Sequence, residues 1–421
     1  MIVAQIIGII NIVFSALFML CYSYQVVYMI ISLFIKPKRY DDAPKTNKYA
    51  FIISARNEEN VIGQLCDCIS RQDYPAELIT TYIVADNCTD STADVARSHG
   101  AQVYERFNTE LIGKGYALTE LFEHIKNTVG YDAYDAYIVI DADNILEPNY
   151  VTEMNKCFSA GNRIAVGYRN SKNFGDNWIS AGYGLWFLRE SRQLNNVRTT
   201  LGTSSEVKGT GFMFSNEIMQ RQGGWIHHLL IEDVQFTIEN VLAGEKVAYC
   251  HDAVLYDEQP TKFKDSFWQR IRWCRGYLQV LRRYTGKLIG GFFRGRGFSH
   301  YDMIMCMSPA FFITLTMIAC NVIGYLAIPF VDINAFVPAL IATIPSILSA
   351  YLLFLCVAIL TTIYEWKRMR MSNAKKILYC FTFPVFMATY IITAACSLFI
   401  KAKWKPVKHN PVKSEEFELK K

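Results

Sequence analysis

The cysteines of this chain follow no pattern that would build a metal site or a disulfide framework. There are 12 of them, but none forms a Cys-x-x-Cys pair, and Cys66 and Cys68 stand at a spacing that suits zinc poorly. Several others lie in apolar stretches, where cysteine behaves as a small hydrophobic residue. We therefore expect free thiols in a reducing compartment.

A strong charge of either sign is also missing. Lys and Arg number 43 and Asp and Glu 38, which gives a net charge of +5, too small to indicate a nucleic-acid partner. The basic residues beside apolar stretches fit instead the rule that Lys and Arg flank membrane spans on the cytosolic side. The sequence contains no internal repeat and no low-complexity segment.

Hydrophobic residues make up 52% of the 421 residues but are unevenly distributed. They concentrate in residues 1–35 and 304–400, whereas residues 36–300 have the composition of a soluble domain. The N-terminal stretch lacks a basic start and a small-residue cleavage pattern, and it is too long for the apolar part of a signal peptide. We expect a retained membrane helix there.

Basic segments beside the apolar ones predict the orientation. Residues 36–39 and 366–370 should be cytosolic, which places the soluble domain in the cytosol of a multi-pass plasma-membrane protein. Three further spans would then leave the basic C-terminal tail outside, against the same rule, so either one C-terminal segment does not cross fully or the rule fails here. Pro384 makes the last apolar segment, 377–400, a candidate for a broken or re-entrant segment.

The soluble region alternates short apolar runs with amphipathic stretches. Strands are predicted at 49–54, 78–85, 101–105 and 137–140. Helices are predicted at 59–70, 92–99, 116–126 and 235–242. This alternation is typical of an α/β fold with a mainly parallel sheet, whose ligands bind at the carboxyl ends of the strands.

The sequence divides into five regions. They are an N-terminal transmembrane helix (1–40), a cytosolic domain (41–260), amphipathic interfacial helices (261–303), C-terminal transmembrane segments (304–400, with spans at about 304–330, 336–363 and 377–400) and a basic tail (401–421). The region 261–303 interleaves Lys, Arg, Trp and Phe, a pattern that favours helices lying at a membrane surface.

Two polar clusters follow the first two predicted strands. In Ser54-Ala55-Arg56-Asn57-Glu58-Glu59, Asn57 and the acids after it suit a helix N-terminus, and taken alone this cluster is best interpreted as a helix cap. Asp86 can accept hydrogen bonds from a ribose or a base, or it can begin an Asx turn. The two interpretations of Asp86 are equally supported.

A third cluster ends the strand at 137–140. Asp141 and Asp143 stand two positions apart after an apolar run. Magnesium bound to a diphosphate typically uses one or two carboxylates together with phosphate oxygens. Two carboxylates this close repel each other unless a cation is present, so we interpret them as ligands of Mg²⁺ or Mn²⁺ rather than as a solvated turn.

Two more clusters lie further along the chain. Glu232 and Asp233 precede a predicted helix, where they are either stabilised by its dipole or provide a general base for an acceptor hydroxyl. In Gln269-Arg270-Ile271-Arg272-Trp273, the arginines can bind a diphosphate and the tryptophan can stack on a sugar ring. The alternative is a basic helix that binds lipid headgroups, and for this motif alone it is the stronger interpretation.

Taken together, the clusters resemble the motifs of family 2 glycosyltransferases. The resemblance rests on Asp86, Asp141-Ala142-Asp143, Glu232-Asp233 and Gln269–Trp273, in this order and followed by membrane spans. It is closest to the processive members, the synthases of cellulose, chitin, hyaluronan and poly-N-acetylglucosamine, and it covers nearly the whole chain. The resemblance implies a GT-A-type nucleotide-sugar domain, with a mixed and mainly parallel sheet, on an α-helical transmembrane bundle.

The same resemblance implies a role for each motif. Glu58, Asp86 and Lys114 would hold the nucleotide, Asp141 and Asp143 the diphosphate and a divalent metal, and Asp233 would be the catalytic base. The acceptor and diphosphate would be bound by Gly209, Thr210, Gly211, Glu232, Gln269, Arg270, Arg272 and Trp273. Trp404 is similar to a tryptophan in the family's cytosolic C-terminal tail. Asn87 and Arg56 differ from the more frequent family residues, which leaves the identity of the nucleotide open.

The expected activity is inverting and processive extension of a β-linked polysaccharide from a UDP-sugar, with UDP-glucose or UDP-N-acetylglucosamine as the favoured donor. Because four spans make a narrow channel for a polymer, a homodimer or an export partner would assist its secretion across the lipid bilayer. One alternative is a non-processive transferase that adds one sugar to a lipid or glycan. The other is a non-catalytic membrane binding or transport protein, against which the intact carboxylate set argues.

Overall fold

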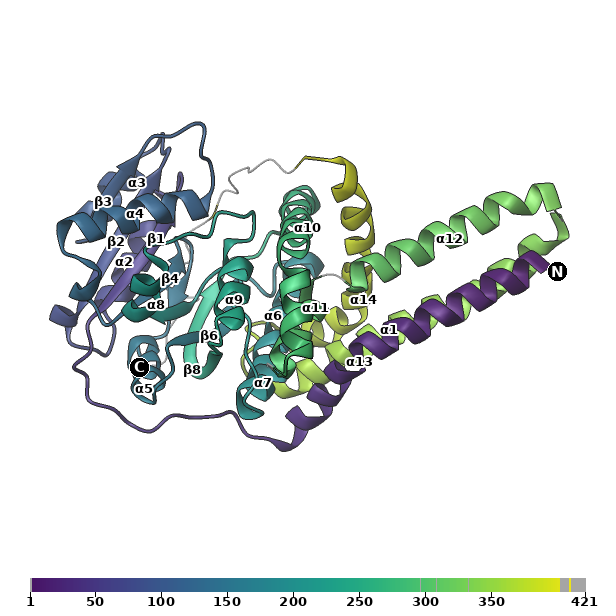
Figure 1. Cartoon of the computed structure of the whole chain (residues 1–421), viewed down its shortest axis with the longest axis horizontal. Coiled ribbons are helices and arrows are strands. Elements are labelled where there is room, and N and C mark those ends of the chain that lie inside the picture. The colour runs from purple at the N-terminus through teal and green to yellow at the C-terminus, as the bar shows by residue number, and fades with distance from the viewer. Residues whose placement is uncertain (1, 296, 308, 332, 402–408, 410–421) are drawn as a thin grey trace.

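The computed structural model describes residues 2–401 except 296, 308 and 332, together with His409. Figure 1 shows three parts: a sheet with helices on both faces, a group of helices beside it that includes α10 and α14, and a long arm formed by α1, α12 and α13. The arm extends away from the sheet. The chain leaves α1 at the end of the arm nearer the sheet and continues from there into the sheet domain.

Within the described residues, eight strands form one sheet in the order β3-β2-β1-β4-β7-β6-β8-β5. Their bounds are β1 (Tyr49–Ala55), β2 (Ile79–Asp86), β3 (Gln102–Arg106), β4 (Ala136–Asp141), β5 (Ile145–Leu146), β6 (Ile164–Ser171), β7 (Phe212–Ser215) and β8 (Val247–Asp257). Strands β1 to β4 are parallel to one another, β7 is antiparallel to β4 and β6, and β5 is antiparallel to β8. The predicted mixed, mainly parallel sheet is therefore confirmed.

Helices cover both faces of this sheet. Their bounds are α2 (Ile62–Ser70), α3 (Thr92–Ser98), α4 (Lys114–Thr128), α5 (Tyr150–Ser159), α6 (Trp178–Arg189), α7 (Asn196–Thr200), α8 (Asn216–Gln222) and α9 (Glu232–Leu242), with short 3₁₀ turns η1 (Ala76–Leu78) and η2 (Tyr131–Ala133) and a π-helical turn η3 (Glu190–Asn195). Alternate side chains of β1 enter two cores: Ile52 packs with Leu121 of α4, and Phe51 with Leu65 of α2. This alternation is what buries a parallel strand on both faces.

The predicted strands and helices up to Asp141 are all present, with boundaries that differ by up to three residues. Residues 142–231, for which the sequence pattern predicted no elements, contain β5, β6 and β7 and the helices α5 to α8. Helix α6 has weak apolar periodicity because it is buried almost all round, so that no polar face marks it as a helix.

The apolar segments form long helices. Their bounds are α1 (Ile2–Phe34), α10 (Phe263–Phe293), α11 (Phe298–Met307), α12 (Pro309–Val331), α13 (Phe336–Glu365) and α14 (Asn373–Phe399), with a 3₁₀ turn η4 (Ile333–Ala335) before α13. By length and composition, α1, α12, α13 and α14 could each cross a membrane.

Helix α14 is placed differently from the other apolar helices. It runs beside α10 rather than along the arm (Figure 1). Its middle packs on the sheet domain, where the ring of Phe386 lies 4.9 Å from that of Tyr183 and Thr389 accepts a hydrogen bond from Arg270 at 2.5 Å. The segment with Pro384 is one continuous helix, so the expected break at this proline is absent from it.

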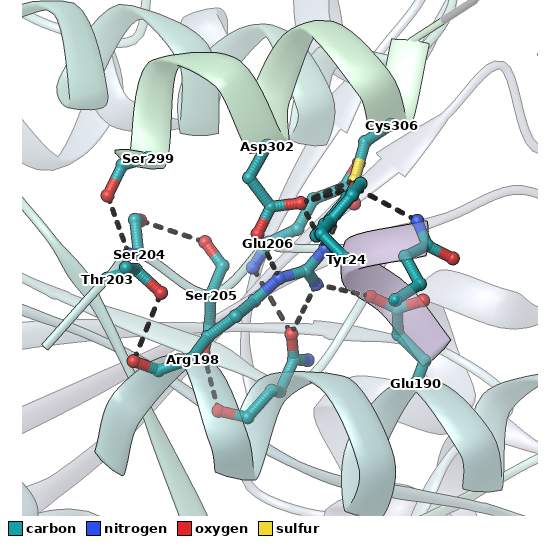
Figure 2. A network of polar contacts seen from close by, with 12 residues as sticks. Tyr24, Glu190, Arg198, Thr203, Ser204, Ser205, Glu206, Ser299, Asp302 and Cys306 are labelled. Carbon is teal, nitrogen blue, oxygen red and sulfur yellow. Dashed lines mark hydrogen bonds and ion pairs between the residues drawn. The ribbon is translucent and has the colours of Figure 1, made fainter. Parts of the chain in front are cut away.

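A buried polar network joins the arm to the sheet domain (Figure 2). The guanidinium of Arg198 in α7 donates hydrogen bonds to both carboxylate oxygens of Asp302 in α11, at 2.7 and 2.9 Å, and to Glu190 at 2.7 Å. The hydroxyl of Tyr24 in α1 donates to Asp302 at 2.9 Å. Because Arg198 and Asp302 are fully buried, each charge depends on the other. The network therefore fixes α1 and α11 against α7.

Candidate active site

One cavity lies at the carboxyl ends of the central strands and gathers most of the predicted site. Its walls include eleven of these residues, namely Glu58, Asp86, Lys114, Asp141, Asp143, Gly209, Glu232, Asp233, Gln269, Arg272 and Trp273. The strands β1, β2 and β4 end side by side, so residues far apart in the sequence meet at one edge of the sheet. The predicted location of the ligand edge is thus the location of the cavity.

The side chain of Lys114 contacts both the end of β4 and the loop before β7. Its ammonium lies 2.5 Å from a carboxylate oxygen of Asp141, donates to the carbonyl of Gly209 at 2.8 Å and is 3.9 Å from Glu232. Burial lowers the pKa of Lys114, but the charges of Asp141 and Glu232 outweigh this effect and raise it. Lys114 is therefore a fixed cation inside the cavity, at the N-terminus of α4.

Asp143 is a second carboxylate of the same turn. Burial, followed by the negative charge of Asp257 on β8, raises the pKa of Asp143 to about 7. The amide of Asn144 lies 3.3 Å from an oxygen of each of these two carboxylates. Two buried carboxylates this close repel each other, so a divalent cation would be stabilised beside them.

The donor set fits a hard cation only in part. No group of three or more His, Cys, Asp or Glu side chains within the described ranges is arranged to hold a metal. Mg²⁺ needs only one or two carboxylates when phosphate oxygens complete its shell. Asp141 and Asp143 fit that requirement, with the diphosphate of a donor supplying the remaining oxygens.

His409 reaches this site from the C-terminal tail. Its Nδ1 lies 3.0 and 3.1 Å from the two carboxylate oxygens of Glu58, and its Nε2 lies 3.9 Å from Asp143. Burial lowers the pKa of His409, but the hydrogen bond to Glu58 and the charge of Asp143 outweigh this and raise it to about 10. The sequence analysis did not select His409, although it stands five residues after Trp404. Trp404 itself lies outside the described residues.

The contacts of Asp86 differ from the turn interpretation of that residue, and those of Asn57 differ from the cap interpretation. Asp86 is buried and accepts a hydrogen bond from Arg106 at 2.7 Å, so an arginine on β3, rather than a following turn, holds its carboxylate. The cap interpretation of Asn57 is wrong. Helix α2 begins after Val61 without a side-chain cap, and the side-chain oxygen of Asn57 instead accepts a hydrogen bond from the backbone N–H of Thr89 at 2.8 Å. The cluster at the end of β1 therefore braces the loop after β2.

The acids at the start of α9 face the same cavity. The backbone N–H of Gly209 donates to Asp233 at 2.5 Å. Burial raises the pKa of Asp233 above its usual range. Burial also raises the pKa of Glu232, to about 7, with the charge of Lys114 opposing and that of Asp233 adding to this effect. A carboxylate whose pKa is raised toward neutrality is suited to accept a proton.

Charged residues that also line the cavity, and that no sequence motif indicated, hold the loop before β7 in place. The ammonium of Lys208 lies 3.0 Å from Glu190 and 3.3 Å from Glu206. Arg169 donates to the carbonyl of Lys208 at 2.8 Å and forms an ion pair with Asp257. These contacts fix the position of Gly209, and therefore of the hydrogen bond that Gly209 gives to Asp233.

Thr210 and Gly211 were predicted to bind the acceptor, but neither residue lines the cavity. The hydroxyl of Thr210 donates to Asn144 at 2.5 Å and accepts from the backbone N–H of Asp141 at 2.9 Å. Gly211 has a φ of +71°, and a Cβ there would stand 1.8 Å from Leu255. Both residues support the site from inside the domain, and glycine is required at 211.

The Gln-Arg-x-Arg-Trp motif lies on α10 and divides between two faces. Gln269, Arg272 and Trp273, at spacings of three and four residues, line the cavity. The buried amide oxygen of Gln269 has no hydrogen-bond partner among the described residues, which suits a ligand contact. Arg270 departs from the prediction: it is fully buried toward α14, 4.7 Å from the ring of Tyr390.

Residues 44–276 match the family described as "Glycosyltransferase like family 2". The chain belongs to this family. It is similar to the probable glycosyltransferase YdaM of Bacillus subtilis (24% identical over 267 residues, 60% of each chain) and to a beta-monoglucosyldiacylglycerol synthase of Synechocystis (27% over 234 residues, 54% of this chain and 47% of that one). The matches thus span about half to three fifths of these relatives.

One solved structure supports the fold of the whole chain. It is a mannosyltransferase from Pyrobaculum calidifontis in complex with GDP-Man and Mn²⁺, with a TM-score of 0.52 and 17% identity. The similarity covers 93% of this chain and 99% of that one. The GT-A-like sheet domain with a mostly helical C-terminal part is therefore an arrangement found in a solved structure.

Proposed function

We propose that this protein is an inverting hexosyltransferase that moves a sugar from a nucleoside diphosphate donor to an acceptor hydroxyl at a membrane surface. The observation that carries the proposal is the single cavity that joins Asp141 and Asp143, Lys114 and Asp233 to the base of the apolar helices. This set contains what the reaction needs: groups for a diphosphate, and a carboxylate for the acceptor proton.

In the proposed reaction, Asp233 takes the proton of the acceptor hydroxyl. The hydroxyl oxygen bonds to the anomeric carbon as the bond to the diphosphate breaks, and the electron pair leaves on the nucleoside diphosphate. Attack from the face opposite the leaving group inverts the configuration, so an α-linked donor gives a β-linked product. Lys114 and Arg272 line the cavity as cations that can stabilise the departing charge.

Asp141 and Asp143 would hold a divalent cation, Mg²⁺ or Mn²⁺, which supplies charge neutralisation at the diphosphate. The donor is a UDP-sugar or another nucleoside diphosphate sugar. Asp86, fixed by Arg106, and Glu58, fixed by His409, supply carboxylates for the nucleoside. The family neighbour with GDP-Man and Mn²⁺ supports both the donor class and the ion.

Two acceptor classes are supported by separate observations. The Gln-Arg-x-Arg-Trp sequence supports repeated extension of a polysaccharide, because it resembles processive family members. The name of the Synechocystis relative, a beta-monoglucosyldiacylglycerol synthase, supports a lipid acceptor. The position of α14 beside α10 supports a tail on the same side as the sheet domain, which we propose is the cytosol.

The test is Asp233→Asn in the full-length protein reconstituted in lipid. We expect transfer from UDP-glucose, UDP-N-acetylglucosamine or GDP-mannose to fall by about 10²–10⁴, while donor binding is kept, because a base acts on the transition state. Asp94→Asn, on the exposed surface of α3, is the matched control and should leave the rate unchanged. Near-normal transfer by Asp233→Asn would overturn the assignment of the base and make Glu232 the first alternative.

A further inference from the structure

The cavity with the catalytic carboxylates does not end at the sheet domain. It continues between α1, α12, α13 and α14, where its walls include Phe14, Ile318 and Met387, and its volume is about 1820 Å³. Pockets for drug-sized ligands usually have roughly 300–1,000 Å³. The space therefore extends well beyond what surrounds the catalytic groups, and it lies in the apolar arm.

One face of α1 follows this space along the arm. Its lining residues begin at Asn11 and recur at spacings of three and four residues as far as Met29, which is the pattern of one side of a helix. Eighteen positions separate these two residues, a rise of about 27 Å. The hydrocarbon core of a bilayer is about 30 Å thick. The cavity thus accompanies α1 over a length close to that of the bilayer core.

The larger polar side chains that α1, α12 and α13 contribute to this stretch are bonded to other protein groups. The amides of Asn11 and Asn321 bond to each other reciprocally, at 3.1 and 2.7 Å. The hydroxyl of Tyr325 lies 2.8 Å from that of Thr343, and the hydroxyl of Tyr351 donates to a backbone carbonyl of α14 at 3.1 Å. Their hydrogen-bonding groups are thus engaged within the helix bundle.

These contacts distinguish two kinds of occupant. A sugar polymer would bring many hydroxyl groups into the space, and a hydroxyl removed from water is unfavourable unless it finds a hydrogen bond. An alkyl or isoprenoid chain needs no such partners and is stabilised by leaving water. The lining therefore favours an apolar chain over a polysaccharide.

The proposed base restricts the headgroup. A phosphate headgroup is already ionised near neutral pH, so it would leave Asp233 with no proton to accept. A neutral hydroxyl is not ionised at that pH and requires a group to accept its proton. The acids at the start of α9 thus fit a lipid whose acceptor is an alcohol.

We infer that the acceptor is a lipid with a neutral hydroxyl headgroup, whose apolar chain lies between α1, α12, α13 and α14 while its hydroxyl reaches Asp233. The inference rests on the proposed function and names its acceptor. The step remains transfer of the sugar to the lipid oxygen, with the proton passing to Asp233 and the nucleoside diphosphate leaving.

The experiment narrows the cavity at mid-depth with Ala350→Trp in the full-length protein. Ala350 lines the cavity in α13, whereas Ala319 of α12 is equally exposed but outside the lining, so Ala319→Trp is the matched control. Each variant is assayed for transfer to dioleoylglycerol and to dihexanoylglycerol, whose chains are too short to reach the same depth.

We expect Ala350→Trp to reduce transfer to dioleoylglycerol at least about tenfold, the loss that follows when a few methylene groups are kept out of an apolar site. Transfer to dihexanoylglycerol should stay close to that of the unchanged protein, and Ala319→Trp should alter neither rate. Equal rates for the two tryptophan variants on dioleoylglycerol would overturn the inference. So would a water-soluble polymer whose synthesis Ala350→Trp blocks. Failure of the unchanged protein to consume any donor would instead contradict the proposed function.

Discussion

At the sheet, the walls of the cavity carry charges, whereas between the membrane helices they carry aliphatic and aromatic side chains. Asp143 and Asp233 at the sheet have raised pKa values because burial and neighbouring charges act on them. In the arm, Asn11 and Asn321 bond to each other and leave their surroundings apolar. One cavity therefore offers an ionic site for a diphosphate and an apolar site for a chain, and an amphiphilic acceptor is the molecule that matches both.

The contacts that join these two regions differ from the side chains that line the cavity in either of them. Arg198, Asp302 and Glu190 form a buried ion network that touches α1, α7 and α11 (Figure 2). Glu190 also holds Lys208, whose neighbour Gly209 donates to Asp233. A continuous set of contacts thus links the first helix of the arm to the loop beside the base, and the relative position of the two regions depends on it.

The largest expected effect comes from removing a carboxylate or the metal ion at the end of the cavity that lies at the sheet. Asp143→Asn, or chelation with EDTA, should lower transfer by about 10²-fold or more, because a metal contributes several kcal/mol of charge stabilisation to the transition state. Added Mg²⁺ or Mn²⁺ should restore the chelated enzyme but not the variant. The measurement is release of nucleoside diphosphate from a labelled donor, and full activity in excess chelator would rule out the metal.

The junction should be the next most sensitive place. Arg198→Met leaves Asp302 buried without its positively charged partner, which costs about 3–5 kcal/mol of stability. Thermal unfolding in detergent should show a large decrease. Arg97→Met, which breaks an exposed ion pair on α3, is the control and should change it little. The double variant Arg198→Met/Asp302→Leu should recover much of the loss, and no recovery would mean that Arg198 acts through packing alone.

A smaller effect is expected from pH. Burial raises the pKa of Asp233, and the pKa of its neighbour Glu232 is about 7. A base must be ionised, so transfer should fall by about tenfold per pH unit as the pH drops below the pKa of Asp233, which is raised above the value of about 3.9 for an ordinary aspartate. Glu232→Gln removes the neighbouring charge and should move this fall to lower pH. A rate that stays flat until the pH reaches the ordinary aspartate value of about 3.9 would contradict the role of these acids.

The smallest of these effects concerns the tail. His409→Ala removes a cation that holds Glu58 and faces Asp143, so donor affinity should weaken by about tenfold, the scale of a charged hydrogen bond. The half-saturating donor concentration should change more than the maximal rate. His124→Ala, on the exposed surface of α4, serves as the comparison. An equal change in the half-saturating donor concentration of the two variants would show that His409 is not needed for donor binding.

Much of the sheet end could be predicted from the sequence because its signals are local. Asp141 and Asp143 follow an apolar strand directly, and the geometry of parallel strands then brings them to the edge where Asp86 also lies. The same local patterns gave β1 to β4 and the helices between them. Predictions failed where side-chain direction mattered, as with Asn57, which bonds to the loop after β2 instead of capping α2.

Helical phase explains the difference between the two arginines of the α10 motif. Arg270 and Arg272 are two positions apart, which is about 200° around a helix, so they cannot both face one cavity. A short motif gives no indication of which of the two faces the ligand. His409 was beyond prediction for another reason: it stands 351 positions after Glu58, and nothing local in the tail indicates that the two meet.

The orientation rule was similarly limited. Counting α14 as a full crossing puts the basic tail on the side opposite the one that the charge rule predicts. The packing of Phe386 on Tyr183, together with His409 at the donor site, supports a path in which α14 runs along the sheet domain. Hydropathy alone does not separate such a helix from a span, because both are long and apolar.

The most direct test follows the label of a sugar nucleotide into its product. Purified full-length protein in lipid vesicles that contain dioleoylglycerol would be given radiolabelled donor with Mg²⁺ or Mn²⁺, and the mixture would be partitioned between organic solvent and water. The account predicts that label enters the organic phase as a product with one β-linked sugar on the lipid, and that Asp233→Asn abolishes this transfer. Label that stays in the donor, or that appears in a water-soluble polymer, would contradict it.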